Sequence, residues 1–168
     1  MHFNRSAFCF YKILSLKTIR TIKMSKKIIK LFLRLSISIG FLSAVADRFG
    51  MWNKEVAVWG NWENFLDYTK IINPVIPENL IEPVGIIATV VEIILPVFLL
   101  IRYKTETFAK ISGFLLLIFA LSMTFSTGIK ATFDFSVFTA SAAAFALSTM
   151  KEKFLELDAF ANKCCEQN

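Results

Sequence analysis

Four apolar stretches, each about as long as a membrane-spanning helix, divide the chain. A helix rises about 1.5 Å per residue, so roughly 20 apolar residues cross the hydrocarbon core of a bilayer. The stretches cover residues 28–46, 83–101, 111–129 and 132–150. They predict an all-α fold in which four transmembrane helices form a bundle.

The composition favours the same fold class. Of 168 residues, 55% are hydrophobic, 18 are Phe, and the mean hydropathy is +0.57. These values exclude a disordered chain, and the apolar share exceeds the roughly 45–50% of soluble domains. The net charge of +6 could indicate nucleic-acid binding. However, the basic residues flank apolar stretches instead of forming a basic face, so we expect the lipid bilayer as partner and no nucleic acid.

Lysine and arginine are distributed unevenly between the two sides that four crossings create. One side receives segments 1–27, 102–110 and 151–168, together with Lys30 and Arg34, and carries fifteen of the 19 basic residues. The other side carries four. Because short basic segments stay in the cytoplasm, we expect a multi-pass protein of a bacterial inner membrane with both termini cytoplasmic.

Three parts follow from this pattern: a basic segment 1–23, a membrane domain 24–150 and a cytoplasmic tail 151–168. The first segment lacks the apolar core and cleavage site of a signal peptide. Met24, followed by Ser-Lys-Lys, resembles a natural start, so we interpret residues 1–23 as a non-native or poorly ordered extension. An amphipathic surface helix is the alternative. Whether translation starts at Met1 or Met24 stays open.

Two short amphipathic helices are expected outside the membrane. In the loop 47–82, apolar residues recur at helical spacing between a possible Asn61 cap and Asn73-Pro74. This pattern predicts an interfacial helix that packs over the bundle. The tail from Lys151 carries a similar apolar stripe. All three Trp residues, Trp52, Trp59 and Trp62, lie in the loop, which is typical of the membrane interface.

Glu92 is the clearest polar candidate inside the bilayer, since it is the middle residue of the second span. A buried charge costs about 2.5–3.5 kcal/mol on insertion scales, so it needs a partner or a wet cavity. Counting from the inner ends of the two helices, Arg34 is the natural partner. Alternatively, Arg34 extends to the headgroups and Glu92 is protonated. Pairing is slightly favoured, and its role is more readily structural than catalytic.

Smaller polar side chains form stripes on the other spans. Ser36, Gly40, Ser43 and Asp47 share one face of the first helix, whose end Asp134 and Lys130 could meet. The favoured interpretation is close helix packing with hydrogen bonds across it. The alternative is a polar cavity open to the outer face, with a wall formed by Asp47, Asp134, Thr124 and Thr127.

Several chemistries lack the residues they need. The only histidine is His2, so a bis-His haem, a conventional zinc site and a His-based triad are not expected. Cys9, Cys164 and Cys165 lie on the predicted cytoplasmic side without a Cys-x-x-Cys, which disfavours a thiol oxidase. No phosphate-binding glycine motif occurs. The pattern therefore identifies no catalytic residue, no metal ligand and no cofactor-binding residue.

From Arg34 to about Met150, two thirds of the chain, the sequence resembles the DoxX family of small four-helix membrane proteins. The resemblance rests on four strings in order: RLSISIGFLSAVADRFG, GNWENFLDYTKIINPVIP, VVEIILPVFLLIRYKT and FALSMTFSTGIKATFDFSVFTASAAAF. Many members have His-Gly near the end of the first helix, where this chain has Ala46-Asp47. The resemblance implies an inner-membrane protein. Some relatives are associated with quinone-linked sulfur oxidation or with membrane oxidoreductase complexes.

Three functions compete at this point, and whether the chain is an enzyme stays open. The first is a membrane subunit or scaffold of a larger complex, whose partner is a membrane-associated oxidoreductase or a second copy of the chain. The second, suggested by the resemblance alone, is an oxidoreductase subunit in which Glu92 and Arg34 bind quinone. The third is a small solute transporter, which needs a polar path linking Asp47, Asp134 and Glu92. The first requires the fewest assumptions.

Overall fold

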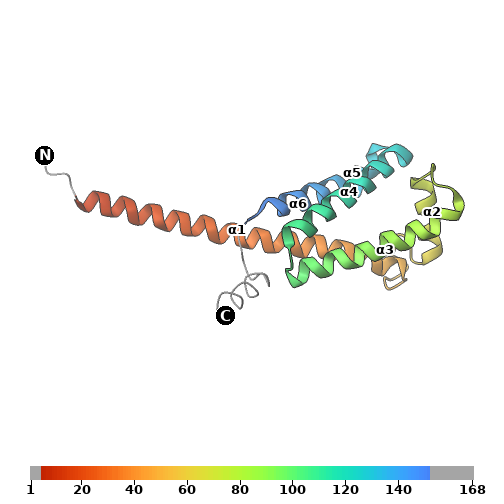
Figure 1. Cartoon of the computed structure of the whole chain (residues 1–168), viewed down its shortest axis with the longest axis horizontal. Helices are drawn as coiled ribbons and strands as arrows, with labels where there is room; N and C mark the ends of the chain where they lie inside the picture. The colour runs from red at the N-terminus through yellow and green to blue at the C-terminus, as the bar shows by residue number, and fades with distance from the viewer. Residues whose placement is uncertain (1–4, 152–168) are drawn as a thin grey trace, which may run out of the picture.

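A computed structural model describes residues 5–151, with the side chains of residues 24–151. Over this range the fold is entirely helical, which confirms the predicted all-α class (Figure 1). The helices are α1 (Arg5–Arg48), α2 (Trp62–Ile72), α3 (Glu78–Ile101), α4 (Thr105–Thr127), α5 (Ile129–Asp134) and α6 (Val137–Thr149). The predicted tail beyond residue 151 lies outside the described residues.

Helix α1 is much longer than the apolar stretch at 28–46. No proline occurs between residues 5 and 48, and Gly40 is the only glycine, so nothing in this segment interrupts the helix. The backbone is already helical at Arg5, within the basic segment that we expected to be an extension. The helix ends before Gly50, whose φ of +67° lies in the left-handed region that glycine adopts readily.

Four helices form two antiparallel pairs, α1 with α3 and α4 with α6 (Figure 1). The pairs converge at the end where α3 connects to α4 and diverge toward the end where α2 lies. The core is at the convergent end, and its buried members are Ile37, Phe41, Leu95, Leu99, Ala109, Ala144 and Leu147. The divergence leaves a space between the pairs at the other end, which we call the α2 end.

Helix α2 confirms the short loop helix predicted from its capping residues. Asn61 is the N-cap, and its side-chain oxygen accepts a hydrogen bond of 2.8 Å from the Asn64 amide. Asn73 is the C-cap, directly before Pro74. The helix packs against both α3 and α4, and Ser126 Oγ donates a 2.8 Å hydrogen bond to the Ile72 carbonyl. It therefore bridges the two helix pairs where they diverge.

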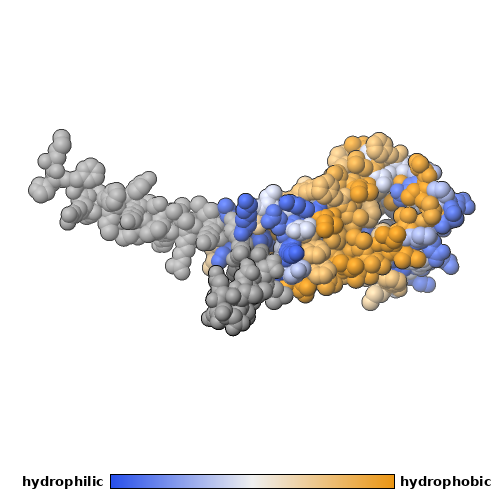
Figure 2. Space-filling model, viewed as in Figure 1, coloured by the Kyte–Doolittle hydropathy of each residue, from blue (hydrophilic) through white to orange (hydrophobic). Residues whose placement is uncertain are grey.

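Within the part of the chain that the structure describes, three helices are long and apolar enough to cross a membrane: Met24–Arg48, Glu78–Ile101 and Thr105–Thr127. In Figure 2 a broad apolar band covers the bundle, with hydrophilic residues at both of its ends. The predicted stretches at 28–46, 83–101 and 111–129 all fall mainly on these helices. A multi-pass membrane protein is therefore compatible with both the sequence and the structure.

The fourth predicted span, 132–150, differs from the structure. It is divided between α5 and α6, because Ser136 adopts a left-handed φ of 55°. The buried Thr132 hydroxyl lies 3.1 Å from the Thr124 hydroxyl and so fixes α5 against the end of α4. Helix α6 has only 13 residues, about 20 Å at 1.5 Å per residue, which is less than the roughly 30 Å hydrocarbon core.

A pair of glycines allows a direct test of how α2 is seated. A Cβ added at Gly85 would lie 2.8 Å from Leu66 Cδ2 and 3.2 Å from Phe65 Cε1, whereas at Gly40 it would meet nothing within 4 Å. We expect Gly85→Ala to destabilise the protein by about 1–3 kcal/mol through overpacking. Gly40→Ala should be neutral or stabilising by about 0.5–1 kcal/mol. Thermal unfolding in detergent measures both, and equal effects would contradict this packing.

Candidate functional site

A cavity of about 1010 Å³ occupies the space between the two helix pairs at the α2 end. Helices α1, α3, α4 and α6 form its walls, and α2 with the preceding loop covers it. Most lining residues are apolar, and Ile37 and Phe41 of the core form part of the lining. Ligand pockets typically measure about 300–1,000 Å³ and have apolar walls with a few polar groups, so the cavity has the size and character of a binding site.

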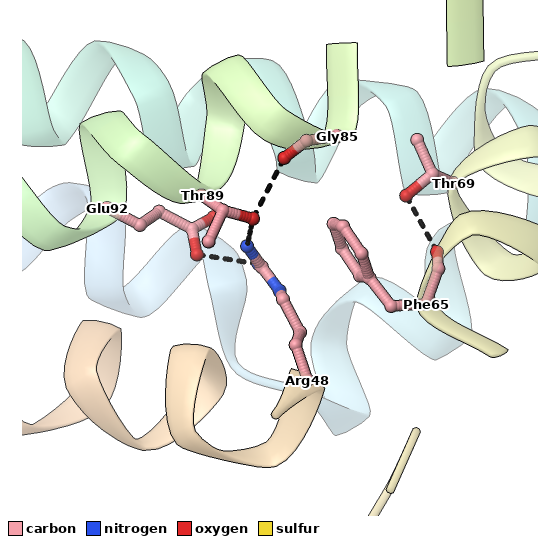
Figure 3. Close-up of polar contacts among 6 residues, drawn as sticks. All are labelled: Arg48, Phe65, Thr69, Gly85, Thr89 and Glu92. Carbon is pink, nitrogen blue, oxygen red and sulfur yellow. Dashed lines mark hydrogen bonds and ion pairs between the residues drawn. The ribbon is translucent and has the colours of Figure 1, made fainter. Parts of the chain in front are cut away.

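Arg48 and Glu92 form an ion pair on the cavity wall, joining the end of α1 to the middle of α3 (Figure 3). Arg48 Nη2 lies 2.6 Å from Glu92 Oε2, and the two side chains are only 4% and 2% exposed. The angle at this contact falls outside hydrogen-bond geometry, so Glu92 Oε2 has an ionic partner but no hydrogen bond in the described residues. The pair places two compensating charges within an apolar bundle.

The Arg48 guanidinium has further partners around it. Its Nη1 donates a 2.7 Å hydrogen bond to Thr89 Oγ1, and that hydroxyl donates in turn to the Gly85 carbonyl at 2.8 Å (Figure 3). Its Cζ lies 3.9 Å from the centroid of the Phe65 ring, in cation–π geometry. Residues from α1, α2 and α3 therefore meet at one arginine.

The backbone of α3 is unusual beside this pair. Pro96 lies one turn after Glu92 within the helix. Proline has no N–H, so the Glu92 carbonyl loses the donor that an ordinary helix would supply. The middle of α3 therefore combines a charged side chain with a weakened backbone ladder.

Asp47 anchors the loop that covers the cavity. Its Oδ2 accepts hydrogen bonds from the amides of Val58 and Trp59, at 2.9 and 3.0 Å, and Oδ1 accepts one from Gly60 at 3.3 Å. Three backbone donors compensate the buried carboxylate, as in an anion-binding loop. Asp47 therefore has a structural role in the cover, although it also contributes to the lining of the cavity.

On α2, outside the spans, the side chains of Tyr68 and Lys70 have shifted pKa values. Burial raises the pKa of the Tyr68 phenol, so this cavity-lining side chain remains a neutral O–H group well above neutral pH. The pKa of Lys70 is also raised, first by its hydrogen bond to Glu78 and then by the charge of that carboxylate. This exposed Lys70–Glu78 pair links α2 to the start of α3.

The predicted partner of Glu92 was wrong: the structure pairs it with Arg48. Arg34 and Arg48 are fourteen residues apart on one continuous helix, a distance of about 21 Å along its axis. Only one of them can therefore reach Glu92. Arg34 is buried nearer the convergent end of the bundle, and it belongs to a different part of α1 from the site. The start of the apolar stretch at residue 28 does not mark the depth of α1 in the bundle, because the helix continues well beyond that residue.

The other predicted polar residues separate into different environments. Asp134 forms an exposed pair with Lys130 within α5, at 2.6 Å, and does not meet Asp47 or Arg48. The Thr124 hydroxyl bonds to Thr132 and the Ala120 carbonyl, while Thr127 donates to the Met123 carbonyl. Of the four residues proposed for a polar cavity wall, only Asp47 lines the cavity, whose wall is mostly apolar.

Between α4 and α6, the predicted helix packing through small and hydroxyl residues is confirmed. Ser141 on α6 donates a 2.9 Å hydrogen bond to the Gly113 carbonyl on α4. A Cβ added at Gly113 would lie 3.0 Å from the Phe145 ring, so glycine permits close approach of these two helices. On α1, Ser36, Gly40 and Ser43 instead border the cavity.

Sequence reasoning missed Arg48, Thr89 and Phe65 as members of the site. Arg48 follows the apolar stretch 28–46, so hydropathy alone does not mark it as a buried residue. One feature of the sequence does indicate Thr89: it lies one turn before Glu92 on the same face of the helix. A partner of Glu92 could therefore contact Thr89 as well. Phe65 could not be placed without the contact between α2 and α3.

Neither a search for metal-binding clusters nor comparison with known proteins assigns a function to the site. Among the described residues, no group of three or more His, Cys, Asp and Glu side chains could hold a metal ion. Neither the family models, the curated proteins nor the solved structures contain a match to this sequence. The resemblance to the DoxX family therefore stays a prediction, and the geometry of the cavity carries the functional argument.

Asp47 provides a prediction about the cover of the cavity. We expect Asp47→Ala to destabilise the loop by about 1–3 kcal/mol, because three part-buried amides lose their acceptor. Asp134→Ala is the matched control, since an exposed pair contributes about 0–1 kcal/mol. All three Trp residues lie at 52–62, so tryptophan fluorescence reports directly on this region. An equal loss of stability in Asp47→Ala and Asp134→Ala would contradict the anchoring role of Asp47.

Proposed function

We propose that this chain is an integral membrane protein that holds a lipophilic small molecule in the cavity between its helix pairs, and that it does so as a membrane subunit of a larger complex. The cavity is the observation that carries this proposal. It is large and apolar and has one buried ion pair on its wall. An empty apolar space of this size is costly, and a lipophilic occupant would recover the lost contacts.

The proposal includes a topology. The chain crosses a bacterial inner membrane four times, with α5 and α6 together making the last crossing and with both termini cytoplasmic. The α2 end then faces outward. The distribution of basic residues supports this orientation, since fifteen of the 19 Lys and Arg residues fall on one side. Cysteine labelling at residue 54, in the loop, and at residue 104, between α3 and α4, tests it, and labelling from the same side would contradict it.

Native mass spectrometry tests the binding function. The protein is purified in mild detergent, transferred to nanodiscs of phosphatidylcholine and released in the gas phase. We expect a bound lipophilic species in one-to-one ratio with the chain. If only the bare chain and phosphatidylcholine adducts are seen, the cavity holds no dedicated ligand and the proposal fails.

Copurification from native membranes tests the subunit role. A stable partner protein would support the membrane subunit, and a flavoprotein or a rhodanese-like partner would place it in an oxidoreductase complex. A chain that migrates alone or as a homo-oligomer at native expression level would contradict a heteromeric subunit. The DoxX resemblance supports the same role but is only an analogy.

A quinone-linked membrane oxidoreductase subunit is the second candidate. The observation that favours it is a buried arginine beside a carboxylate at the wall of an apolar cavity. Arg48 could donate a hydrogen bond to a quinone oxygen, and Glu92 could relay a proton to that oxygen when a partner enzyme supplies the electrons that reduce the quinone. Quinone-dependent activity of a purified complex should then fall on Glu92→Gln while the protein still accumulates. Unchanged activity in the variant would reject this candidate.

A further inference from the structure

The cavity is covered at the α2 end and open at one side. At the α2 end, the loop residues Val58 and Trp59 line the cavity, and the Asp47 carboxylate holds their backbone amides. Helix α2 bridges α3 and α4 on the same end. A ligand that came through this cover would have to break the part-buried hydrogen bonds to Asp47.

The open side lies between α1 and α6. On α3, the lining residues Val84, Ala88 and Glu92 are half-buried or buried. On α1 and α6, several lining residues are exposed, including Gly40 and Thr139, and on α4 the lining residue Ile118 is exposed as well. The helices meet near the core and then separate, so the gap between them leads from the surface into the cavity.

Small side chains border this gap. Ser36 and Gly40 on α1 face the side on which α6 carries Ala140 and Ala143, and all four line the cavity. A Cβ added at Gly40 would meet no atom within 4 Å, so the space beside it is open. This part of α1 belongs to a candidate membrane span, and α6 is itself apolar. The gap therefore opens toward acyl chains and away from water.

The charges of the lining select the head group of the ligand. Asp47, Arg48 and Glu92 are its charged residues, so the wall carries one positive and two negative charges. Each carboxylate is already compensated, Asp47 by backbone amides and Glu92 by Arg48. With one positive and two negative charges on the wall, an anionic head group would be repelled. The buried Arg48 Nε, which has no hydrogen-bond partner among the described residues, remains a donor for a neutral oxygen.

We propose that the cavity takes a neutral amphiphile, such as a long-chain alcohol, directly from the bilayer through the gap between α1 and α6. This inference rests on the proposed function, because it names the ligand class and the access route of the same cavity. A neutral hydroxyl or carbonyl group matches the Tyr68 hydroxyl and the Arg48–Glu92 pair without adding charge. The apolar tail then fills the space against the core.

Photolabelling of the full chain in phosphatidylcholine nanodiscs tests this inference. The probe is a diazirine-bearing hexadecanol, with the corresponding ionised fatty acid as its anionic counterpart, and mass spectrometry locates the label. We expect the alcohol to label peptides of α3 and α4 that line the cavity, and the fatty acid to label them less. Preferential labelling by the fatty acid would overturn the neutral head group.

The access route is tested by narrowing the gap. Gly40→Phe combined with Ala140→Phe should slow labelling on the order of tenfold, because access then needs a conformational change. The matched control is Ile39→Phe, at a position on α1 that is 62% exposed and outside the lining, and it should leave the rate unchanged. An unchanged rate in the double variant, or faster labelling in Asp47→Ala, would show that ligand comes through the cover instead.

Two outcomes separate this inference from the proposed function. Absence of cavity labelling in the unmodified protein would overturn the neutral amphiphile as ligand, whereas the proposed function fails only if native mass spectrometry also shows no bound lipophilic species. Cavity labelling that is insensitive to the narrowed gap would leave ligand binding intact and overturn the lateral route alone. A second copy in the gap is detected with Gly40→Cys in a background without the three native cysteines. Disulfide-linked dimers at residue 40 would mean that a neighbouring chain, and not a lipid, occupies the gap.

Discussion

Replacing Arg48 with methionine should destabilise the protein by about 3–5 kcal/mol, because the substitution leaves the buried Glu92 carboxylate without its compensating charge. Adding Glu92→Gln should recover most of that loss. The free energy of unfolding, measured in mixed micelles for the single and double variants, gives the interaction energy of the pair. We expect it to be large, since Arg48 Nη2 and Glu92 Oε2 are 2.6 Å apart.

Arg34 is the matched control for this cycle. It is an arginine of the same helix, it is also buried, and it lies about 21 Å farther along α1. The effects of Arg34→Met and Glu92→Gln should therefore add within about 0.5 kcal/mol, as for distant sites. A stronger interaction of Glu92 with Arg34 than with Arg48 would overturn the description of the site.

Filling the cavity should abolish ligand binding without unfolding the protein. Ala88 is half-buried on α3, one turn before Glu92, and its side chain lines the cavity. We expect Ala88→Phe to place its ring in this space, so that the bound lipophilic species is lost from the native mass spectrum. The thermal unfolding midpoint without ligand should be unchanged or higher, because the added ring gains contacts in an empty volume.

The neighbouring position supplies the control for the filled cavity. Ile87 is 63% exposed on the outside of the bundle and does not line the cavity. Ile87→Phe should therefore retain the ligand. If both variants keep the ligand, the bound species lies elsewhere on the protein, and the cavity is not the binding site.

The elements that the sequence predicted well are those with local signals. Helix α2 lies between an asparagine cap and an Asn-Pro pair, and both signals depend only on neighbouring residues. The apolar stretches of α3 and α4 are similarly local, although the structure begins α3 at Glu78 and α4 at Thr105, several residues before hydropathy alone would place them. Polar residues at a helix start conceal its true beginning.

The division of the fourth predicted span into α5 and α6 could not be predicted from local sequence signals. Residues 132–150 are apolar enough to be predicted as one helix, and the left-handed backbone of Ser136 separates α5 from α6. In α5, Thr132 lies 3.1 Å from Thr124 on α4. Such a contact joins residues from two helices, so hydropathy contains no sign of it.

The candidate site was only partly predictable for the same reason. Glu92 could be identified because a carboxylate amid apolar residues is costly wherever the helix lies. Its partner depends on the relative depth of α1 and α3, and the cavity depends on how far the two helix pairs diverge. Both are properties of packing between helices, and neither is a property of one stretch of sequence.

An experimental density map of the full chain in nanodiscs would show whether Arg48 and Glu92 meet on the wall of an occupied cavity. We expect the Arg48 guanidinium between Glu92, Thr89 and the Phe65 ring, with elongated non-protein density between the α1–α3 and α4–α6 pairs. Helices closed together with no such density, or a Glu92 side chain directed to the acyl chains and away from Arg48, would contradict this expectation.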